Sequence, residues 1–368
     1  LRNTEQGCNE YISQFPSGRY VFEAKQILTD FVEKRKILEK VRSNPNSYTP
    51  GMIKGYLKDG TISRDDLLNS KIPEKVIDTL DNIISHNLKL GETPESIPDG
   101  YTEVYFWGIP GSGKTCVLSA ILSTAHQKGY LQIAQGPGLG YTTKLKNIFN
   151  ESIAFLPPAT PFADTQYLPF VLKKEKEDPR SASLIELSGE IFKSFYEKSA
   201  GNELSPQKQE ALNTIIGFLN GNNKKLHFFF IDYETENKLD VHGLTQSDYL
   251  EAAARYFQDN NIFKKSTAAI YIVITKSDLM PGDKGQRLDN LKEYLRDANF
   301  TSFVNSLKAR CQEHSINSGK ILATNFSLGH VYFKQICSFD SETSENIIDI
   351  LIRRIKPDSK SILDVFNN

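Results

Sequence analysis

Apolar positions follow two patterns along the chain, and together they predict a mixed α/β architecture. Four short apolar runs, bounded by turn residues, are typical of buried strands. Between them lie longer segments in which apolar residues recur every three or four positions, as on the buried face of a helix. We therefore expect an open, largely parallel sheet with helices on both faces. The four runs are Val104–Trp107, Leu226–Asp232, Ala268–Thr275 and Ile321–Phe326.

The N-terminal part of the chain shows only helical patterns. A helical hairpin is expected over 1–44, because Phe15-Pro16-Ser17-Gly18 interrupts two helical segments. Short helical patterns continue over 51–90, and the clearest runs from Val76 to Ile84 after Pro73. Glycines and prolines over 91–100 indicate a linker. We predict a small all-α region over 1–98 and a second domain over 99–368.

Two further features are expected within the second domain. The extended runs 167–174 and 181–187 flank a polar turn and predict an antiparallel hairpin. The glycines over 135–140 do not lie between a predicted strand and a predicted helix, so we interpret them as a loop. We interpret 151–166 as a proline-rich irregular segment. Helices are expected over 190–222, 245–260, 288–314 and 344–355.

Composition narrows the environment and the partners that we expect. With 368 residues and a net charge of −1, the chain can form a large core and has no general attraction for nucleic acid. The four cysteines are scattered, which favours free thiols in a reducing cytoplasm. No apolar run approaches membrane-spanning length. Because the chain begins with Leu1 rather than Met, we expect it to be part of a longer polypeptide.

The segment Gly108-Ile-Pro-Gly-Ser-Gly-Lys-Thr115 carries the clearest chemistry. It follows an apolar strand pattern, precedes a helical pattern and matches G-x-x-x-x-G-K-[ST], the phosphate-binding P-loop. Its glycines let backbone N–H groups face phosphate oxygens, and the following helix adds partial positive charge. Lys114 is expected to reach the β and γ phosphates, and the Thr115 hydroxyl to ligate Mg²⁺. The segment predicts nucleotide binding.

A second motif follows another buried strand. Thr275-Lys276-Ser277-Asp278 resembles the [NT]-K-x-D guanine motif of Ras-like GTPases of the TRAFAC class. The Asp278 carboxylate would accept hydrogen bonds from guanine N1–H and its N2 amino group, which adenine cannot offer together. The order of elements from about 102 to 356 also resembles that of a Ras-like domain. The expected fold is therefore a Ras-like P-loop NTPase with one antiparallel hairpin.

The resemblance implies a site for GTP or GDP with Mg²⁺. Lys114, Glu190 and Thr160 are the implied catalytic residues, and hydrolysis to GDP would accompany a nucleotide-dependent switch. Thr115, Glu186 and one of Thr160 or Thr165 would lie at the metal. Loop 151–166 would respond to the γ-phosphate. The implied nucleotide contacts are Ile109, Pro110, Gly111, Ser112, Gly113, Lys114, Thr115, Cys116, Gly189, Thr275, Lys276, Asp278, Ser327 and Leu328.

Three positions depart from the Ras-like pattern. Glu186 replaces the Asp of D-x-x-G, Glu190 replaces the water-positioning Gln, and Pro110 occupies a position that is Gly in Ras. Binding is compatible with all three. A second carboxylate near the γ-phosphate is electrostatically unfavourable, so we expect slow hydrolysis.

Finer resemblances suggest a biological setting. The Pro-Pro-x-Thr loop at 157–160 and the hairpin resemble bacterial conflict-system GTPases of the double-GTPase group. Residues 9–28 loosely resemble a tetratricopeptide-like unit. These resemblances imply a protein partner at the N-terminal helices and the switch loop, and nucleotide-dependent self-association.

Other interpretations use different residues. In a P-loop ATPase, Asp232 would be the acid beside Mg²⁺ and Glu234 the base, which leaves the hairpin and Thr275–Asp278 without a role. Nucleotide could also merely stabilise a scaffold, with little or no hydrolysis. A nucleotide kinase is less favoured because no Arg-rich lid follows. His227 and His330 are expected to be structural.

Overall fold

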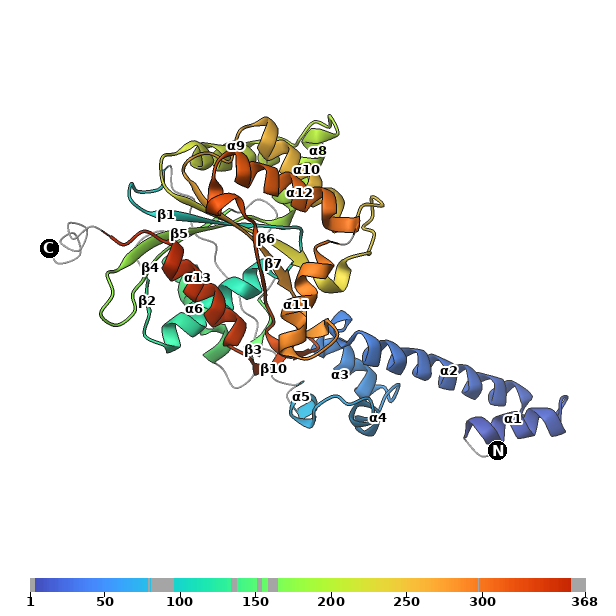
Figure 1. Ribbon diagram of the computed structural model, residues 1–368. Coiled ribbons are helices and arrows are strands. Elements are labelled where there is room, and N and C mark those ends of the chain that lie inside the picture. Colours follow the sequence, from blue (N-terminus) through green and yellow to red (C-terminus); the bar gives the residue numbers. More distant parts are fainter. Residues whose placement is uncertain are drawn as a thin grey trace. The chain divides into compact units, whose positions relative to one another are not determined.

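The structure is a computed structural model, and it describes residues 4–78, 80, 96–133, 138–150, 154–157, 165–296 and 298–358 (Figure 1). The chain divides into two compact units. The first combines the described part of Leu1–Ser85 with Ile153–Leu156 and His330–Ser338, and the second contains the rest.

The first unit is mainly helical, and polar side chains begin several of its helices. Thr4 and Thr49 accept backbone N–H groups at the starts of α1 and α3, and Ser63 forms a capping box with Asp66 at α4. α1 packs on α2 as a hairpin. The helices are α1 (Glu5–Gln14), α2 (Val21–Ser43), η1 (Pro45–Ser47), α3 (Pro50–Lys58), α4 (Arg64–Asn69) and α5 (Glu74–Asp78).

A small three-stranded sheet in the order β3-β10-β9 completes this unit. The turn between its last two strands carries Phe333, which is fully buried against a cluster that includes Val41 and Ile53. Segments far apart in sequence thus share one apolar core. The strands are β3 (Ala154–Phe155), β9 (Gly329–Tyr332) and β10 (Gln335–Phe339).

The second unit is built on a seven-stranded sheet in the order β2-β4-β5-β1-β6-β7-β8. Strands β5, β1, β6, β7 and β8 pair in parallel, so their carboxyl ends meet at one edge. β4 runs antiparallel to both β5 and β2. The strands are β1 (Thr102–Trp107), β2 (Leu131–Ile133), β4 (Gln166–Leu172), β5 (Arg180–Glu186), β6 (Lys225–Asp232), β7 (Thr267–Thr275) and β8 (Leu322–Asn325).

Helices cover both faces of this sheet (Figure 1). α6, α7 and α13 lie together on one face, and α8, α9, α10 and α12 on the other. The helices are α6 (Lys114–Gln127), α7 (Leu139–Asn147), η2 (Ile148–Asn150), α8 (Gly189–Ser199), α9 (Pro206–Asn220), η3 (Tyr233–Thr235), α10 (Gln246–Asp259), η4 (Ser277–Leu279), α11 (Lys284–Tyr294), α12 (Ala298–Glu313), η5 (Ile316–Gly319) and α13 (Glu342–Arg354).

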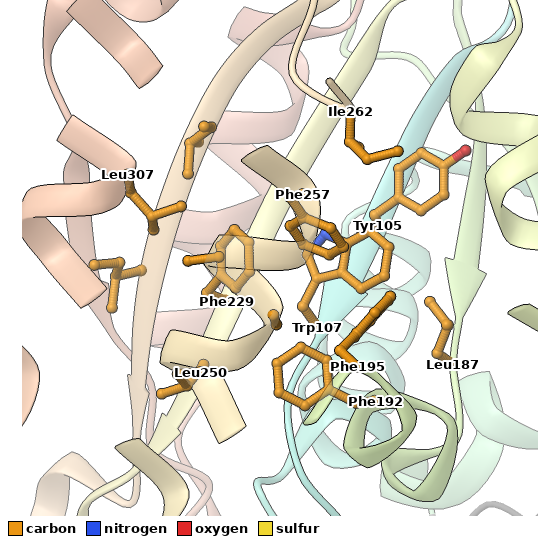
Figure 2. Close-up of a cluster of buried hydrophobic side chains, with 14 of the residues drawn as sticks. Tyr105, Trp107, Leu187, Phe192, Phe195, Phe229, Leu250, Phe257, Ile262 and Leu307 are labelled. Carbon is orange, nitrogen blue, oxygen red and sulfur yellow. The ribbon is translucent and has the colours of Figure 1, made fainter. Parts of the chain in front are cut away.

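An aromatic core lies between the sheet and α8 and α10 (Figure 2). Trp107 of β1 contacts the ring of Phe257 at 4.8 Å and that of Phe195 at 6.0 Å between centroids. Tyr105 stacks on Trp107 with an interplanar angle of 5°. This packing stabilises β1 and so supports the loop that follows it.

The predicted fold class is confirmed. A mostly parallel sheet with an antiparallel hairpin carries helices on both faces, and an all-helical stretch precedes it in sequence. The hairpin formed by β4 and β5 lies where the two extended runs predicted it, with Tyr167 opposite Ile185.

Several elements differ from the sequence-based expectation. The segment interpreted as a loop over 135–140 already contains the start of α7, because Gly138 takes the left-handed conformation and Leu139 begins the helix. Residues 134–137 lie outside the described part. The sequence also missed β2, β3, β9 and β10, which are only two to five residues long and too short to show a clear period.

Candidate functional site

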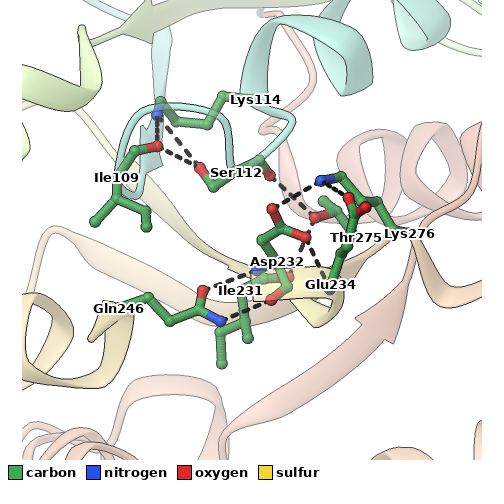
Figure 3. A network of polar contacts seen from close by, with 9 residues as sticks. All are labelled: Ile109, Ser112, Lys114, Ile231, Asp232, Glu234, Gln246, Thr275 and Lys276. Atoms are coloured by element: carbon green, nitrogen blue, oxygen red, sulfur yellow. Dashed lines mark hydrogen bonds and ion pairs between the residues drawn. The ribbon is translucent and has the colours of Figure 1, made fainter. Parts of the chain in front are cut away.

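The P-loop occupies the turn between β1 and α6, at the carboxyl edge of the parallel strands. α6 begins at Lys114, so its first backbone N–H groups belong to the motif itself. Lys114 Nζ donates to the Gly108 carbonyl oxygen at 2.7 Å. It also donates to the Ile109 carbonyl oxygen at 3.0 Å (Figure 3). Ser112 Oγ donates to the Ile109 carbonyl at 2.8 Å. These bonds hold the loop around the lysine ammonium group.

Two glycines permit close backbone contacts at this loop. Gly113 has a φ of 84°, and a Cβ atom there would lie 3.3 Å from the Thr275 side chain. Gly189, the first residue of α8, lies against the loop: a Cβ atom there would be 2.1 Å from the Pro110 nitrogen. At Gly113 the left-handed φ favours glycine, and at Gly189 only glycine permits so close an approach to the loop backbone. The start of α8 is thus packed directly on the P-loop.

Thr115 and Glu186 meet beside the loop. Glu186 ends β5, which pairs with β1 in a register that places it opposite Phe106. The Thr115 hydroxyl donates to Glu186 Oε1, and the Glu186 side chain is fully buried. The contact places a hydroxyl oxygen and a carboxylate side by side at the start of α6.

The chemistry of these two groups fits Mg²⁺. Hydroxyl and carboxylate oxygens are hard ligands, and Mg²⁺ commonly takes one or two protein oxygens together with phosphates and water. Within the described residues, no cluster of three His, Cys, Asp or Glu side chains could hold a metal by itself. Phosphate oxygens and water are the ligands that usually complete a Mg²⁺ site with so few protein oxygens.

Lys114 lies in a water-poor environment with two acids nearby. Burial lowers the pKa of Lys114 to about 8, while Glu186 and Glu190 act in the opposite direction. A phosphate at the loop would favour the charged lysine further. Glu190, in the first turn of α8, is half-buried and close enough to act on the lysine electrostatically.

Two neighbouring strand ends carry a second polar network (Figure 3). Thr275 Oγ1 lies 3.0 Å from the Ser112 carbonyl oxygen, so β7 is joined directly to the P-loop. Lys276 Nζ donates to Asp232 Oδ2 at 2.8 Å and to Glu234 Oε2 at 2.6 Å. Burial alone would lower the pKa of Lys276, but the two carboxylates raise it.

Asp232 is therefore engaged on the β7 side of the site. Its Oδ1 accepts the Glu234 N–H at 3.0 Å, and its own backbone forms two bonds with the side chain of Gln246. Both carboxylate oxygens have partners away from Thr115. The acid in contact with Thr115 is Glu186, so the geometry offers the ATPase interpretation no support.

The remaining part of the second motif faces the loop after β8. Asp278, in η4, is half-buried, and its Oδ1 accepts the Ser327 hydroxyl at 2.8 Å. Ser277 is tied to the same loop because its N–H and hydroxyl both donate to the Phe326 carbonyl, each at 3.2 Å. The structure thus brings Asp278 and Ser327 together, and Leu328, the next residue, is buried.

Of the two threonines proposed as alternative metal ligands, only Thr165 lies in the described part of the chain. Thr160, and most of the expected switch loop 151–166, lies outside the described residues. Thr165 precedes β4, whose first residue Gln166 is opposite Glu186. Its side chain is 5% exposed. The antiparallel register brings Thr165 to the edge of the sheet that holds Glu186.

Some contributors to the site were absent from the sequence-based prediction. Tyr141, on the missed helix α7, donates its hydroxyl to Glu186 Oε2 at 3.1 Å. The pairing of Asp232 and Glu234 with Lys276 was also unexpected. No motif marks Tyr141, and no local pattern pairs Lys276 with Asp232 and Glu234, because both contacts depend on elements that meet only in the folded sheet.

Comparison with known proteins gives little further information. No family model matches the sequence, and no curated protein matches it. Among solved structures, the chain is similar to the GTPase-like domain of Ski7 from S. cerevisiae, solved with GTP bound. The TM-score is 0.32 and the identity 16%, over 62% of this chain and 43% of that one, so the chain spans less than half of that structure. The function must therefore be inferred from the site residues themselves.

In the described part of the chain, no helix combines the length and the apolar character needed to span a membrane.

Proposed function

We propose that this chain binds guanine nucleotide with Mg²⁺, hydrolyses GTP slowly and acts as a nucleotide-dependent switch. One observation carries the proposal. The P-loop, Glu186 and the segment 275–278 come from distant parts of the sequence and meet at the carboxyl edge of one parallel sheet. Ligands of open α/β sheets bind at this edge.

The phosphates are assigned to the P-loop. Its glycines and the start of α6 present backbone N–H groups to an anion, and Lys114 supplies the positive charge. In the described structure Lys114 bonds to the carbonyls of Gly108 and Ile109. Phosphate oxygens would offer the ammonium group stronger, charge-assisted acceptors.

The cation and the base are assigned to the two flanking segments. Thr115 and Glu186 would hold Mg²⁺, which neutralises charge developing on the phosphates during hydrolysis. Asp278, with one oxygen bonded to Ser327, would accept the two donors on the guanine edge. The aliphatic stem of Lys276 would cover the ring while Asp232 and Glu234 hold its ammonium group.

A base-exchange experiment tests this proposal. Binding of GTP, ATP and xanthosine triphosphate would be measured for the wild type, Asp278→Asn and the control Asp259→Asn, which alters an exposed acid at the end of α10. Asp278→Asn replaces an acceptor with a donor. It should weaken GTP binding by roughly 10⁴-fold and improve binding of xanthosine triphosphate.

Three outcomes of this experiment would contradict the proposal. They are preference of the wild type for ATP, unchanged base preference of Asp278→Asn, and equal effects of the two Asp→Asn variants. Lys114→Ala provides a second test, because it removes the side-chain charge of the P-loop and should abolish binding of every triphosphate. Calorimetry that finds unchanged affinity for this variant would refute the phosphate assignment.

A further inference from the structure

Tyr141 links a helix outside the recognised motifs to the acid of the candidate metal site. Its side chain is 2% exposed, and its hydroxyl donates to Glu186 Oε2 at 3.1 Å. The other oxygen of the same carboxylate accepts the Thr115 hydroxyl. Glu186 is thus bound at both oxygens by donors from two different helices.

The position of Tyr141 follows from the way α7 begins. Gly138 has a φ of 86°, and a Cβ atom there would lie 2.3 Å from the Tyr167 carbonyl oxygen on β4. The Thr142 hydroxyl donates to the Gly138 carbonyl at 3.0 Å, and α7 also packs on α6. The helix that carries Tyr141 is therefore anchored against the sheet and against the P-loop helix.

We propose that Tyr141 is a positioning residue for the Mg²⁺ site, an inference that rests on the proposed nucleotide-binding function. A glutamate has one more rotatable bond than the aspartate usual at this place, so its carboxylate needs an additional restraint. The Tyr141 hydroxyl supplies it by holding Oε2. Oε1 then stays in place to accept the Thr115 proton.

The structural relationship predicts a selective defect in Tyr141→Phe. Loss of the hydroxyl removes one restraint on the Glu186 carboxylate and so weakens the orientation of Thr115. Removal of a group that orients a metal ligand commonly lowers metal affinity about 10- to 100-fold. Binding of nucleotide in the absence of Mg²⁺ depends on the P-loop backbone and Lys114, so it should be unaffected.

The matched control is Tyr167→Phe. Tyr167 is also a buried tyrosine, but its hydroxyl bonds to Ser183 at 2.8 Å. Both variants lose one buried hydroxyl and keep the aromatic ring. Only Tyr141→Phe removes a contact with Glu186.

The experiment is a Mg²⁺ titration of fluorescently labelled GTP binding, with binding also measured in EDTA. The Mg²⁺ midpoint of Tyr141→Phe should rise about 10- to 100-fold, whereas Tyr167→Phe should behave like the wild type. Affinity in EDTA should be the same for all three proteins. A midpoint within twofold of wild type, or an equal shift in the control, would overturn the inference.

A double-mutant cycle separates positioning from loss of stability. In a Glu186→Gln background, Tyr141→Phe should cause no further shift, because the carboxylate it positions is already gone. An equal shift in both backgrounds would refute the role of Tyr141. Failure of the wild type to bind labelled GTP at any Mg²⁺ concentration would instead refute the proposed function, and the inference with it.

Discussion

The hydroxyl of Thr275 lies 3.0 Å from the carbonyl oxygen of Ser112, and the two residues are 163 positions apart in the chain. The same hydroxyl lies 3.2 Å from the Ile231 carbonyl oxygen. Thr275 therefore connects the ends of β6 and β7 to the P-loop, and the two sequence motifs share a hydrogen bond.

Replacement of Thr275 by Val should weaken both stability and nucleotide binding. Valine has a similar shape but leaves a buried carbonyl of the P-loop without its donor, which typically costs about 1–3 kcal/mol. Urea unfolding and GTP calorimetry would measure the two effects. Thr124→Val is the control, since the buried Thr124 hydroxyl has no partner among the described residues. Equal losses of stability and GTP affinity in Thr275→Val and Thr124→Val would contradict a specific role for the hydrogen bond between Thr275 and the P-loop.

Nucleotide affinity should fall as the pH rises through the pKa of Lys114. That pKa is lowered by burial to about 8, and bound phosphate should raise it, so the complex holds a proton that the free protein loses above pH 8. Between pH 7 and pH 9 we expect roughly a tenfold loss of affinity. One proton is linked to binding, so affinity falls by up to tenfold for each pH unit above the pKa.

Calorimetry in buffers of different ionisation enthalpy would detect the proton uptake. The phosphates are already ionised over this range, so they contribute little. Residual binding by Lys114→Arg should lack this dependence, because arginine stays charged. A proton uptake of zero at pH 9 in the wild type would exclude Lys114 as the phosphate-binding cation.

Hydrolysis should be slow, and Glu190 should be one cause. Ras-like enzymes without a partner's arginine turn over at about 10⁻⁴ to 10⁻³ per second, and we expect this rate or a lower one. Glu190→Gln removes a negative charge near the phosphates, so it should increase turnover and the preference for triphosphate over diphosphate. Single-turnover assays would measure both proteins.

Two results would change this interpretation of Glu190. Wild-type turnover on the order of 1 per second belongs to partner-activated enzymes and would contradict the prediction. Undetectable turnover in both proteins would favour the alternative in which nucleotide stabilises a scaffold. The exposed Glu210→Gln provides a charge-matched control on α9.

His227 should make the protein less stable in mild acid. The ring is fully buried and its Nδ1 accepts the Trp107 indole N–H at 3.0 Å; burial lowers its pKa from 6.5 to about 3. Between these two values the unfolded chain binds a proton that the folded chain does not, so stability falls as the pH falls.

Because of His227, the free energy of unfolding should fall by about 1.4 kcal/mol between pH 7.5 and 5.5. This is the effect of one histidine that takes up a proton only in the unfolded chain. Urea unfolding at the two pH values would measure it. His227→Gln keeps an acceptor for Trp107 but does not titrate. In this variant the contribution of residue 227 to the pH dependence of the free energy of unfolding should vanish. His330→Gln, at an exposed site on β9, is the control for loss of a histidine elsewhere in the chain.

The sequence alone determined the elements that carry strong local signals. The P-loop could be predicted because its glycines and lysine lie within one eight-residue segment. Strands β1, β6 and β7 could be predicted because each is a nearly continuous apolar run buried on both faces. The antiparallel hairpin followed from two extended runs around a polar turn. These features depend on backbone conformation and burial over a few neighbouring residues.

Only the tertiary structure decided which distant side chains meet. Asp232 and Glu186 both end strands, and the sequence offered each as the acid of a metal site in a different interpretation. Strand order and register place Glu186 against Thr115 and Asp232 against Lys276. Tyr141 reaches Glu186 because a short helix packs on β4 and α6. Such contacts form through long-range pairing, and no local pattern of apolar and polar residues encodes them.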